Sequence, residues 1–311
     1  MARIPVAVLG AGPLADLLAK RVQARSDLQL AGVVATSATP PAGTHTVIYL
    51  PVSTEMAAGT SATHINELLR AGFNVVSTLP AEALNHADVL AACREGKSTF
   101  HGSGGFQSSL ATRFNRAFST ITRHIREVEL VEELDVESNA AHPWCSCADS
   151  GIDEKNAEAL QTRTAEVGSY YTAGLNLLSE AVFGKVESKA AIHAAAAHVL
   201  PNVLQRPRNG VEAPAQIVVQ RTLGDKVTYD SVWTKRDGSS TPLRYRFSTT
   251  SADAVGHVVI TFHAQGDVRP ADHLACTGLL DAIISVQESA PGILRHDLDI
   301  WQVKTDDRFG R

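Results

Sequence analysis

The stretch that decides the fold is Val6-Ala-Val-Leu-Gly-Ala-Gly-Pro-Leu-Ala15, close to the start of the chain. The apolar run 6–9 ends at Gly10, and an apolar pattern with helical spacing begins after Gly12. This order of strand, glycine turn and helix is typical of a dinucleotide-binding domain. Gly10 permits the tight turn, Gly12 leaves room for a pyrophosphate, and Ala15 lets the helix pack closely on the strand.

The residues after the turn suit the first turn of a helix. Pro13 has no N–H to contribute, and the first helical position needs none. The free amides that follow, from Leu14 onward, would face the phosphates at the positive end of the helix dipole. We therefore assign Gly10, Gly12, Pro13 and Leu14 to cofactor binding. The alternative is a parallel-sheet turn that binds nothing.

Length and composition restrict the class of protein. A chain of 311 residues, 44% hydrophobic, predicts one large domain or two. The net charge of −5 and the pI of about 6.2 exclude a basic footprint for nucleic acid. No apolar run reaches the length of a membrane span, and the N-terminus reads as a strand rather than a signal peptide. Four cysteines do not make a disulfide framework. We expect a soluble cytoplasmic protein with reduced thiols.

Strands and helices alternate through the first third of the chain. Strands are expected at 28–35, 46–50, 74–78 and 98–101, and helices at 14–25, 61–71 and 85–95. Such alternation predicts an α/β fold with a Rossmann-type, doubly wound parallel sheet.

The character of the sequence changes at about residue 126. Residues 127–136 alternate charged and apolar side chains, which indicates a strand with one face in water. Further strands are expected at 217–221, 226–233, 244–249 and 256–264, and helices at 108–124, 154–183 and 270–288. The sequence thus predicts a dinucleotide-binding domain at 1–125 and a second α+β domain with a mostly antiparallel sheet at 126–268. The second domain would serve substrate binding and oligomerisation.

Three stretches of the chain carry a resemblance to a known family. They are residues 6–15, the set formed by 74–78, Gly102-Ser-Gly-Gly-Phe106 and 127–136, and residues 279–293. In these stretches the chain resembles the dihydrodipicolinate reductase-like superfamily, and most closely its 2,4-diaminopentanoate dehydrogenase and native amine dehydrogenase branch. The resemblance implies that the terminal segment 269–311 returns to the nucleotide domain. It also implies reduction of imines, or oxidation of amines, with NAD(P).

The chain departs from that branch at the site. The branch has Cys-Glu-Glu-Leu after the strand that matches 74–78, where a glutamate polarises the substrate. This chain has Leu79-Pro-Ala-Glu82, with the glutamate shifted by two residues. The loop that usually reads Gly-Thr-Gly-x-Asn-Pro-Gly-Phe is shorter here and lacks Asn-Pro. The His-His and Lys motif of dihydrodipicolinate reductase itself, and the Glu-Lys-Pro of sugar-type oxidoreductases, are absent.

Two residues are candidates for catalysis. Glu82 is the only carboxylate just beyond the fourth strand, and open α/β sheets bind ligands outside the carboxyl ends of their strands. A glutamate there could hold an ammonium group or shuttle its proton. His101 ends a strand at the same edge, and imidazole suits proton transfer near neutral pH. The alternatives are a solvated loop residue for Glu82 and a structural hydrogen bond for His101.

The residues after the second predicted strand indicate whether the cofactor is NADP or NAD. NAD-selective folds commonly place an acidic residue there, but this chain has Thr36 and Ser37, which could donate to a 2′-phosphate. We expect NADP, with NAD as the alternative; a further alternative is an ordinary polar loop that binds no phosphate. The other residues assigned to the cofactor are Pro51, Thr78, Gly102, Ser103 and Gly104.

The substrate side is less sharply marked. Phe106 is placed there by its family position, Trp144 as an apolar wall, and Tyr170 and Tyr171 as a proton donor or pocket wall. Packing in the core is the alternative for the aromatic residues. The stretch His142-Pro-Trp-Cys-Ser-Cys147 lacks the second pair of ligands that zinc knuckles use, so no metal is expected.

The predicted function is hydride transfer between a nicotinamide and the C=N or CH–NH carbon of a small amine or imine. Two alternatives are open. One is a carbonyl reductase with His101 or a tyrosine as the acid, and the other is a non-catalytic relative that binds the nucleotide. A small-molecule substrate is expected, with neither nucleic acid nor membrane as a partner. An exposed face on the second sheet predicts a homodimer.

Overall fold

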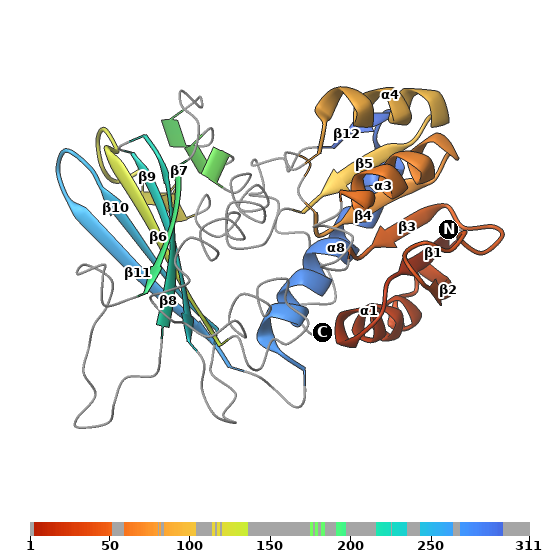
Figure 1. Cartoon of the computed structure of the whole chain (residues 1–311), viewed down its shortest axis with the longest axis horizontal. Helices are drawn as coiled ribbons and strands as arrows, with labels where there is room; N and C mark the ends of the chain where they lie inside the picture. The colour runs from red at the N-terminus through yellow and green to blue at the C-terminus, as the bar shows by residue number, and fades with distance from the viewer. Residues whose placement is uncertain are drawn as a thin grey trace.

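The computed structural model describes residues 3–51, 59–79, 81, 84–103, 114–135, 175–183, 191–196, 216–234, 243–263 and 268–294, with short gaps inside 114–135, 175–183 and 216–234. The strands among them form two six-stranded sheets. Figure 1 shows the two sheets in separate regions of the molecule, with the helix α8 (Pro270–Glu288) beside the first.

The first sheet has the strand order β12-β5-β4-β3-β1-β2, and all its pairs are parallel. Its strands are β1 (Ile4–Leu9), β2 (Leu28–Val34), β3 (Thr46–Tyr49), β4 (Asn74–Ser77), β5 (Thr99–Gly102) and β12 (Gly292–Ile293). Because β2 and β3 lie on opposite sides of β1, the strand order reverses at β1. Open α/β sheets bind ligands beyond the carboxyl ends of the strands at such a point. The predicted doubly wound sheet is confirmed.

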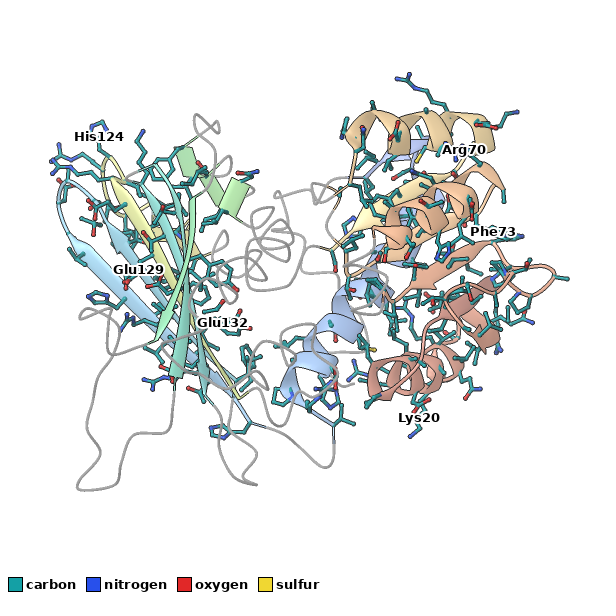
Figure 2. The ribbon with its side chains drawn as sticks, viewed as in Figure 1. Lys20, Arg70, Phe73, His124, Glu129 and Glu132 are labelled. Atoms are coloured by element: carbon teal, nitrogen blue, oxygen red, sulfur yellow. The ribbon has the colours of Figure 1, made fainter. Side chains whose placement is uncertain are left out.

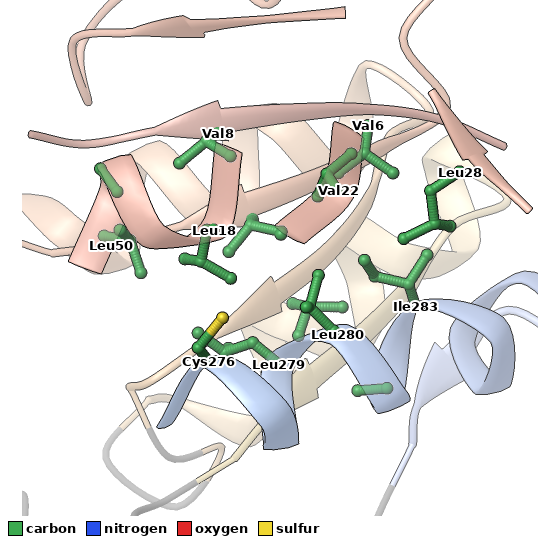
Figure 3. Packing of buried hydrophobic residues seen from close by; sticks show 14 of the residues in the cluster. Val6, Val8, Leu18, Val22, Leu28, Leu50, Cys276, Leu279, Leu280 and Ile283 are labelled. Carbon is green, nitrogen blue, oxygen red and sulfur yellow. The ribbon is translucent and has the colours of Figure 1, made fainter. Parts of the chain in front are cut away.

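Helices cover both faces of this sheet. On one face, α1 (Pro13–Ala24) and α8 (Pro270–Glu288) pack on Val6 and Val8 of β1. On the other, α3 (Thr60–Arg70) and α4 (His86–Gly96) pack on Ala7 and Leu9. A strand buried on both faces needs a continuous apolar run, which is why residues 6–9 show no alternation. Figure 3 shows the first of these cores, where Leu18 and Val22 of α1 approach Leu279 and Ile283 of α8.

The terminal segment is bound to the first sheet by polar contacts as well. Arg21 of α1 donates to Thr277 Oγ1 of α8 over 3.1 Å, and its second nitrogen lies 2.5 Å from His273 Nδ1. Beyond α8, β12 adds the edge strand next to β5. Among the described residues, no helix combines the length and apolar character needed to cross a bilayer.

The second sheet has the order β11-β10-β6-β9-β8-β7. Its strands are β6 (Glu127–Asp135), β7 (Ala191–Ala196), β8 (Gln216–Leu223), β9 (Val227–Thr234), β10 (Leu243–Thr250) and β11 (Val255–Phe262). Only β6 and β9 pair in parallel; the other neighbouring pairs are antiparallel. The sheet is therefore mixed and, as expected, mostly antiparallel.

Three elements differ from the sequence expectation. β7 was not expected, because its alanine-rich sequence has low strand propensity and the strand depends on pairing with β8. β12 has two residues, too few to show a period. The helix expected at 108–124 ends early, since the chain forms a turn from Thr120 and His124 has a φ of 52°. Residues 154–174 of the helical stretch expected at 154–183 lie outside the described residues.

Candidate active site

The turn after β1 is closed by a contact that only glycine permits. The N–H of Gly10 donates to Val34 O of β2 over 2.9 Å, and the N–H of Leu50 donates to Leu9 O over 2.8 Å. Gly10 has a φ of 153°, and a Cβ built on it would lie 2.7 Å from the Cβ of Leu50. The ends of β1, β2 and β3 can therefore meet at this point only if residue 10 has no side chain.

Gly12, further along the same turn, has a different role. It is the N-cap of α1, with a φ of 91°, and no described side chain caps the helix. A Cβ built on Gly12 would meet no described atom within 4 Å. Pro13 occupies the first turn, and the N–H of Asp16 donates to Gly12 O over 3.1 Å. Open space at the Cβ position, next to the first free amides of a helix, fits a phosphate group.

The segment after β2 contains no carboxylate. The chain turns there through a hydrogen bond from Ala38 N to Ala35 O of 3.0 Å. Thr36 in this turn is half-buried and Ser37 is exposed. Both residues follow the carboxyl end of β2, next to the glycine turn of β1. The hydroxyl groups are thus in the segment where the sequence places the ribose contacts.

Ser77, which was not predicted as a site residue, joins the ends of three strands. Its buried hydroxyl donates to Tyr49 O of β3 over 2.9 Å and accepts from Leu79 N over 3.0 Å. Its carbonyl accepts from Ser103 N over 2.8 Å. A serine directly after the apolar pair Val75 and Val76 was the available signal. These bonds hold the backbone at Leu79, next to Thr78, and at Ser103. Thr78 and Ser103 are two of the residues assigned to the cofactor.

His101 lies in β5, where its side chain is buried. Its Nδ1 is 3.0 Å from Leu294 O, just after β12. A carbonyl oxygen can only accept, so Nδ1 carries the hydrogen of this bond. The contact ties the terminal segment to β5, which is the structural role considered as the alternative for this residue. A catalytic role for His101 stays a prediction.

The structure gathers one group of the predicted residues at the carboxyl edge of the first sheet. Gly10, Gly12, Pro51, Thr78, Gly102 and Ser103 all follow or end strands that are neighbours there. Six further predicted residues lie outside the described ones: Glu82, Gly104, Phe106, Trp144, Tyr170 and Tyr171. The stretch 142–147 lies outside them too.

A buried carboxylate on the second sheet was not predicted either. Glu132 of β6 accepts a hydrogen bond from the hydroxyl of Tyr229 on β9, with 2.5 Å between the oxygens. Both side chains are buried. The signal in the sequence was a break in the alternation of 127–136, where Val131 and Glu132 exchange the expected apolar and charged positions.

Comparison with known proteins is informative for the fold. No protein-family model matches the chain, and no curated protein matches it. Solved structures match it over most of its length. Amine dehydrogenase from Mycobacterium smegmatis has a TM-score of 0.62 at 13% identity, covering 94% of this chain and 95% of that chain. Dihydrodipicolinate reductase from Paenisporosarcina sp. TG-14, with dipicolinate bound, has a TM-score of 0.50 at 11% identity, covering 94% and 97%.

The chain therefore shares its two-domain fold with an amine dehydrogenase and a dihydrodipicolinate reductase. This is the fold that the resemblance in the sequence implied. A third structure of this two-domain dehydrogenase type is GenD2 from gentamicin A biosynthesis in complex with NAD, with a TM-score of 0.53 at 14% identity, covering 94% of this chain and 90% of that chain. At such identities, the likeness to these structures concerns the fold alone.

Proposed function

We propose that this chain is an NAD(P)-dependent oxidoreductase that transfers a hydride between a nicotinamide and the C=N or CH–NH carbon of a small amine or imine. The observation that carries the proposal lies at Gly12, where a Cβ would meet no described atom within 4 Å and where no described side chain caps the start of α1. It lies at the point where the strand order reverses. The fold shared with amine dehydrogenase, and with a structure that holds NAD, supports the same conclusion.

The residues around the glycine turn would have distinct roles in binding the cofactor. Gly12 would admit the pyrophosphate, and the amides of Leu14 and Ala15 would donate to it at the positive end of α1. Ser77 holds the ends of β3, β4 and β5 in fixed positions, and these ends would help to hold the cofactor. The bound cofactor supplies the hydride, so the protein contributes binding, orientation and electrostatics.

Glu82 and His101 remain our proposed catalytic residues. Phe106, Trp144, Tyr170 and Tyr171 remain the proposed substrate side. With amines and matched ketones as substrates, Glu82→Ala should abolish amine turnover in an amine-type mechanism. If Glu82→Ala keeps full turnover while His101→Ala loses it, the reaction is that of a carbonyl reductase.

NADP is the cofactor we propose, because Thr36 and Ser37 stand where NAD-selective folds place a carboxylate. Titration with NADPH and NADH, followed by nicotinamide fluorescence, tests this. NADPH should bind at least about tenfold more tightly than NADH. Ser37→Asp places a carboxylate on an exposed position and should reduce that preference, whereas Ser37→Ala is the matched neutral control. A folded protein that binds neither nucleotide would exclude the oxidoreductase.

We also propose that the chain forms a homodimer through the second sheet. On β11, Val255 is 58% exposed and Val259 is 50% exposed. They lie opposite Thr250 and Arg246 of β10, on one face of the sheet. Light scattering coupled to gel filtration should give the mass of a dimer, and Val259→Glu should give that of a monomer. An unchanged mass in the variant would place the interface elsewhere.

A further inference from the structure

Strand β2 contains an irregularity at its centre. Leu30 lies opposite Val6 of β1, but the next residue of β1, Ala7, lies opposite Gly32. Ala31 is therefore an extra residue between two paired ones, which is the pattern of a β-bulge. Bulges turn the side chains of a strand to new directions, and they are frequent next to active sites.

The two faces of the first sheet are covered by different helices. α1 and α8 pack on one face, and α3 and α4 pack on the other. Figure 2 shows Lys20 of α1 and Arg70 of α3 on opposite sides of this sheet. What a side chain of β2 can contact therefore depends on the face to which it belongs.

The bulge moves the even-numbered residues of β2 from the α1 face to the α3 face. Leu30, before the bulge, packs on the cluster that α1 and α8 cover, whereas Val34, after it, packs on the cluster that α3 and α4 cover. Gly32 lies opposite Ala7, which belongs to the second cluster. Gly32 is therefore on the α3 face as well.

On this face, Gly32 meets the loop that follows β2. A Cβ built on Gly32 would lie 3.0 Å from Cγ of Pro41. Carbon atoms in ordinary contact are about 3.5–4.0 Å apart, so a methyl group at position 32 would displace Pro41. Gly32 is not among the glycines with a positive φ, so the contact with Pro41 is the reason for a glycine here. The missing side chain lets the loop lie directly on the strand.

Pro41 is itself held in place within the loop. Its carbonyl oxygen accepts from the N–H of Thr44 over 3.2 Å and from the Thr44 hydroxyl over 2.7 Å. Thr44 is buried, and so is Pro40. Residues 40–44 thus form an anchor on the α3 face of the sheet.

Ser37 lies between this anchor and the glycine turn. Val34, at the end of β2, accepts from the N–H of Gly10 over 2.9 Å. Ser37 follows Val34 by three residues and precedes Pro41 by four, and its side chain is exposed. Two fixed points so close in sequence restrict the backbone of Ser37 before any ligand binds.

We propose that Gly32 is a positioning residue for the choice of cofactor. By admitting Pro41 to β2, it holds Ser37 where the hydroxyl donates to the 2′-phosphate of NADP. This inference rests on the NADP preference proposed above. A loop that is ordered in advance binds more tightly, because less conformational freedom is lost on binding.

The ratio of NADPH affinity to NADH affinity tests this role. Contacts at the glycine turn are common to both nucleotides and cancel in the ratio. In fluorescence titrations of the full chain, Gly32→Val should lower the ratio at least about fivefold and Gly32→Ala about threefold, with NADH affinity within about twofold of the wild type. Gly278→Ala is the matched control, because a Cβ at this position of α8 meets no described atom within 4 Å. It should keep the wild-type ratio.

The other partner of the contact gives an independent measurement. Pro41→Ala should lower the ratio about threefold, because the loop loses its contact with β2. In the double variant Gly32→Ala/Pro41→Ala, the added methyl group fills the space of the missing ring carbons. Its ratio should therefore be higher than the two single effects give together. A contact that served stability alone would lower both affinities and leave the ratio unchanged.

Wild-type ratios in both Gly32→Val and Pro41→Ala would overturn the proposal. If Gly32→Val does not fold, wild-type ratios in Gly32→Ala and Pro41→Ala have the same meaning. A wild-type chain that binds NADH as tightly as NADPH would also overturn it, while leaving the oxidoreductase in place. Failure of the proposed function is seen separately, as a folded wild-type chain that binds neither nucleotide.

Discussion

Gly10 and Leu50 approach so closely that a Cβ on residue 10 would lie 2.7 Å from the Cβ of Leu50. Gly10 follows β1 and Leu50 follows the neighbouring strand β3. The N–H of Gly10 is bonded to Val34 O of β2, and the N–H of Leu50 is bonded to Leu9 O of β1. Neither strand can move aside without losing those bonds. The turn is therefore constrained by packing as much as by the cofactor it is proposed to bind.

Gly10→Ala should destabilise the fold, because the new methyl group overlaps Leu50. We expect a loss of about 1–3 kcal/mol in the free energy of unfolding beyond the backbone strain. Gly43→Ala is the matched control, since Gly43 has a φ of 82° but no described atom within 4 Å of its Cβ position. Urea unfolding of both variants measures the difference. Equal midpoints would show that the contact with Leu50 relaxes at no cost.

Gly12→Ala should separate binding from stability. Its Cβ meets no described atom, so the stability loss should come from the backbone conformation alone, about 1–3 kcal/mol at a φ of 91° and a ψ of −175°. The same Cβ would occupy the space assigned to the pyrophosphate, so NADPH affinity should fall at least about tenfold. Fluorescence titration measures the affinity. A variant that binds NADPH as tightly as the wild type would place the phosphates elsewhere.

Cys276 should make the protein less stable in alkali. Burial between α1 and α8 raises the pKa of its thiol to about 11, with Arg21 acting in the opposite direction. In the unfolded chain the thiol ionises near pH 9, whereas the folded protein keeps it protonated. The contribution of the protonated thiol to the free energy of unfolding is thus complete below pH 9. It is lost as the pH rises from 9 to about 11, by about 3 kcal/mol at most.

Urea unfolding at pH values from about 8 to about 11 checks this prediction. Cys276→Ala should flatten the fall in stability over this range, because the variant has no thiol to ionise on unfolding. Lysine and tyrosine titrations are common to both proteins and cancel in the difference. Cys93→Ala removes the other described thiol whose pKa burial raises, and serves as comparison. A wild-type slope in Cys276→Ala would contradict the assignment.

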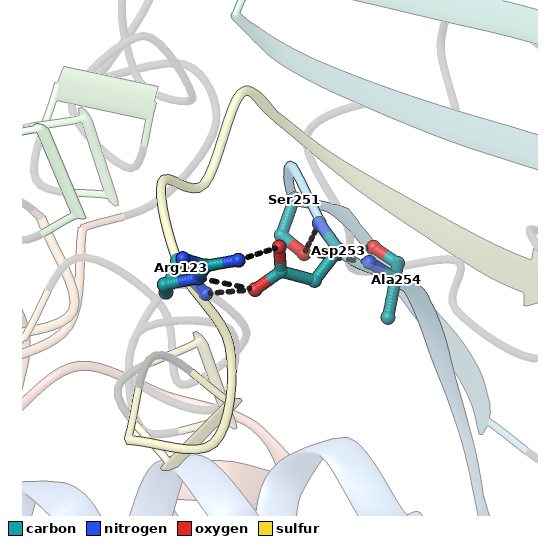
Figure 4. A network of polar contacts seen from close by, with 4 residues as sticks. All are labelled: Arg123, Ser251, Asp253 and Ala254. Carbon is teal, nitrogen blue, oxygen red and sulfur yellow. Dashed lines mark hydrogen bonds and ion pairs between the residues drawn. The ribbon is translucent and has the colours of Figure 1, made fainter.

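The turn between β10 and β11 should depend on Ser251 more than on the ion pair beside it. Figure 4 shows Arg123 bonded to Asp253, and Ser251 bonded within the turn. The Ser251 hydroxyl donates to Ala254 O over 2.9 Å and accepts from Ala254 N over 3.0 Å. Because Ser251 is buried, Ser251→Ala should cost about 1–2 kcal/mol.

Asp253→Asn should cost less, since exposed ion pairs contribute little and salt screens them. The hydrogen bond from Arg123 lowers the pKa of the Asp253 carboxyl. The ionised Asp253 carboxylate therefore stabilises the fold at pH values above the ordinary carboxyl pKa. This stabilisation is lost as the pH falls through the lowered pKa. Thermal unfolding of both variants, repeated in high salt, measures the two effects. A larger loss for Asp253→Asn than for Ser251→Ala would reverse their order.

The first sheet could be predicted from the sequence because its signals are local. Helix 14–25 was expected and Pro13–Ala24 is observed, and the helix expected at 270–288 has those bounds. Proline and glycine mark several of the element ends, and the apolar runs report burial directly. β7 and β12 could not be predicted in the same way, because pairing with a partner distant in sequence makes them strands.

Part of the candidate site has local signals of the same kind, although the roles of its residues stay predictions. The spacing of Gly10 and Gly12 predicts their role, since backbone conformation and access depend on the absence of a side chain. Ser77 was not predicted, because its importance comes from three strand ends that meet only in the fold. Glu132 needed both the break in the alternation and the register that places Tyr229 beside it.

The return of α8 and β12 to the first sheet has a consequence for how the protein is made. Residues 4–102 leave the ribosome before residues 127–262, but the side chains of β1 and α1 that pack against α8 lack that cover until residues 270–288 have been synthesised. The second sheet, whose strands span 127–262, is complete before then. The half with the first sheet is thus synthesised before the second sheet and closes after it, and its nascent form lacks the contacts that α8 makes in the cluster of Val6, Val8 and Leu18.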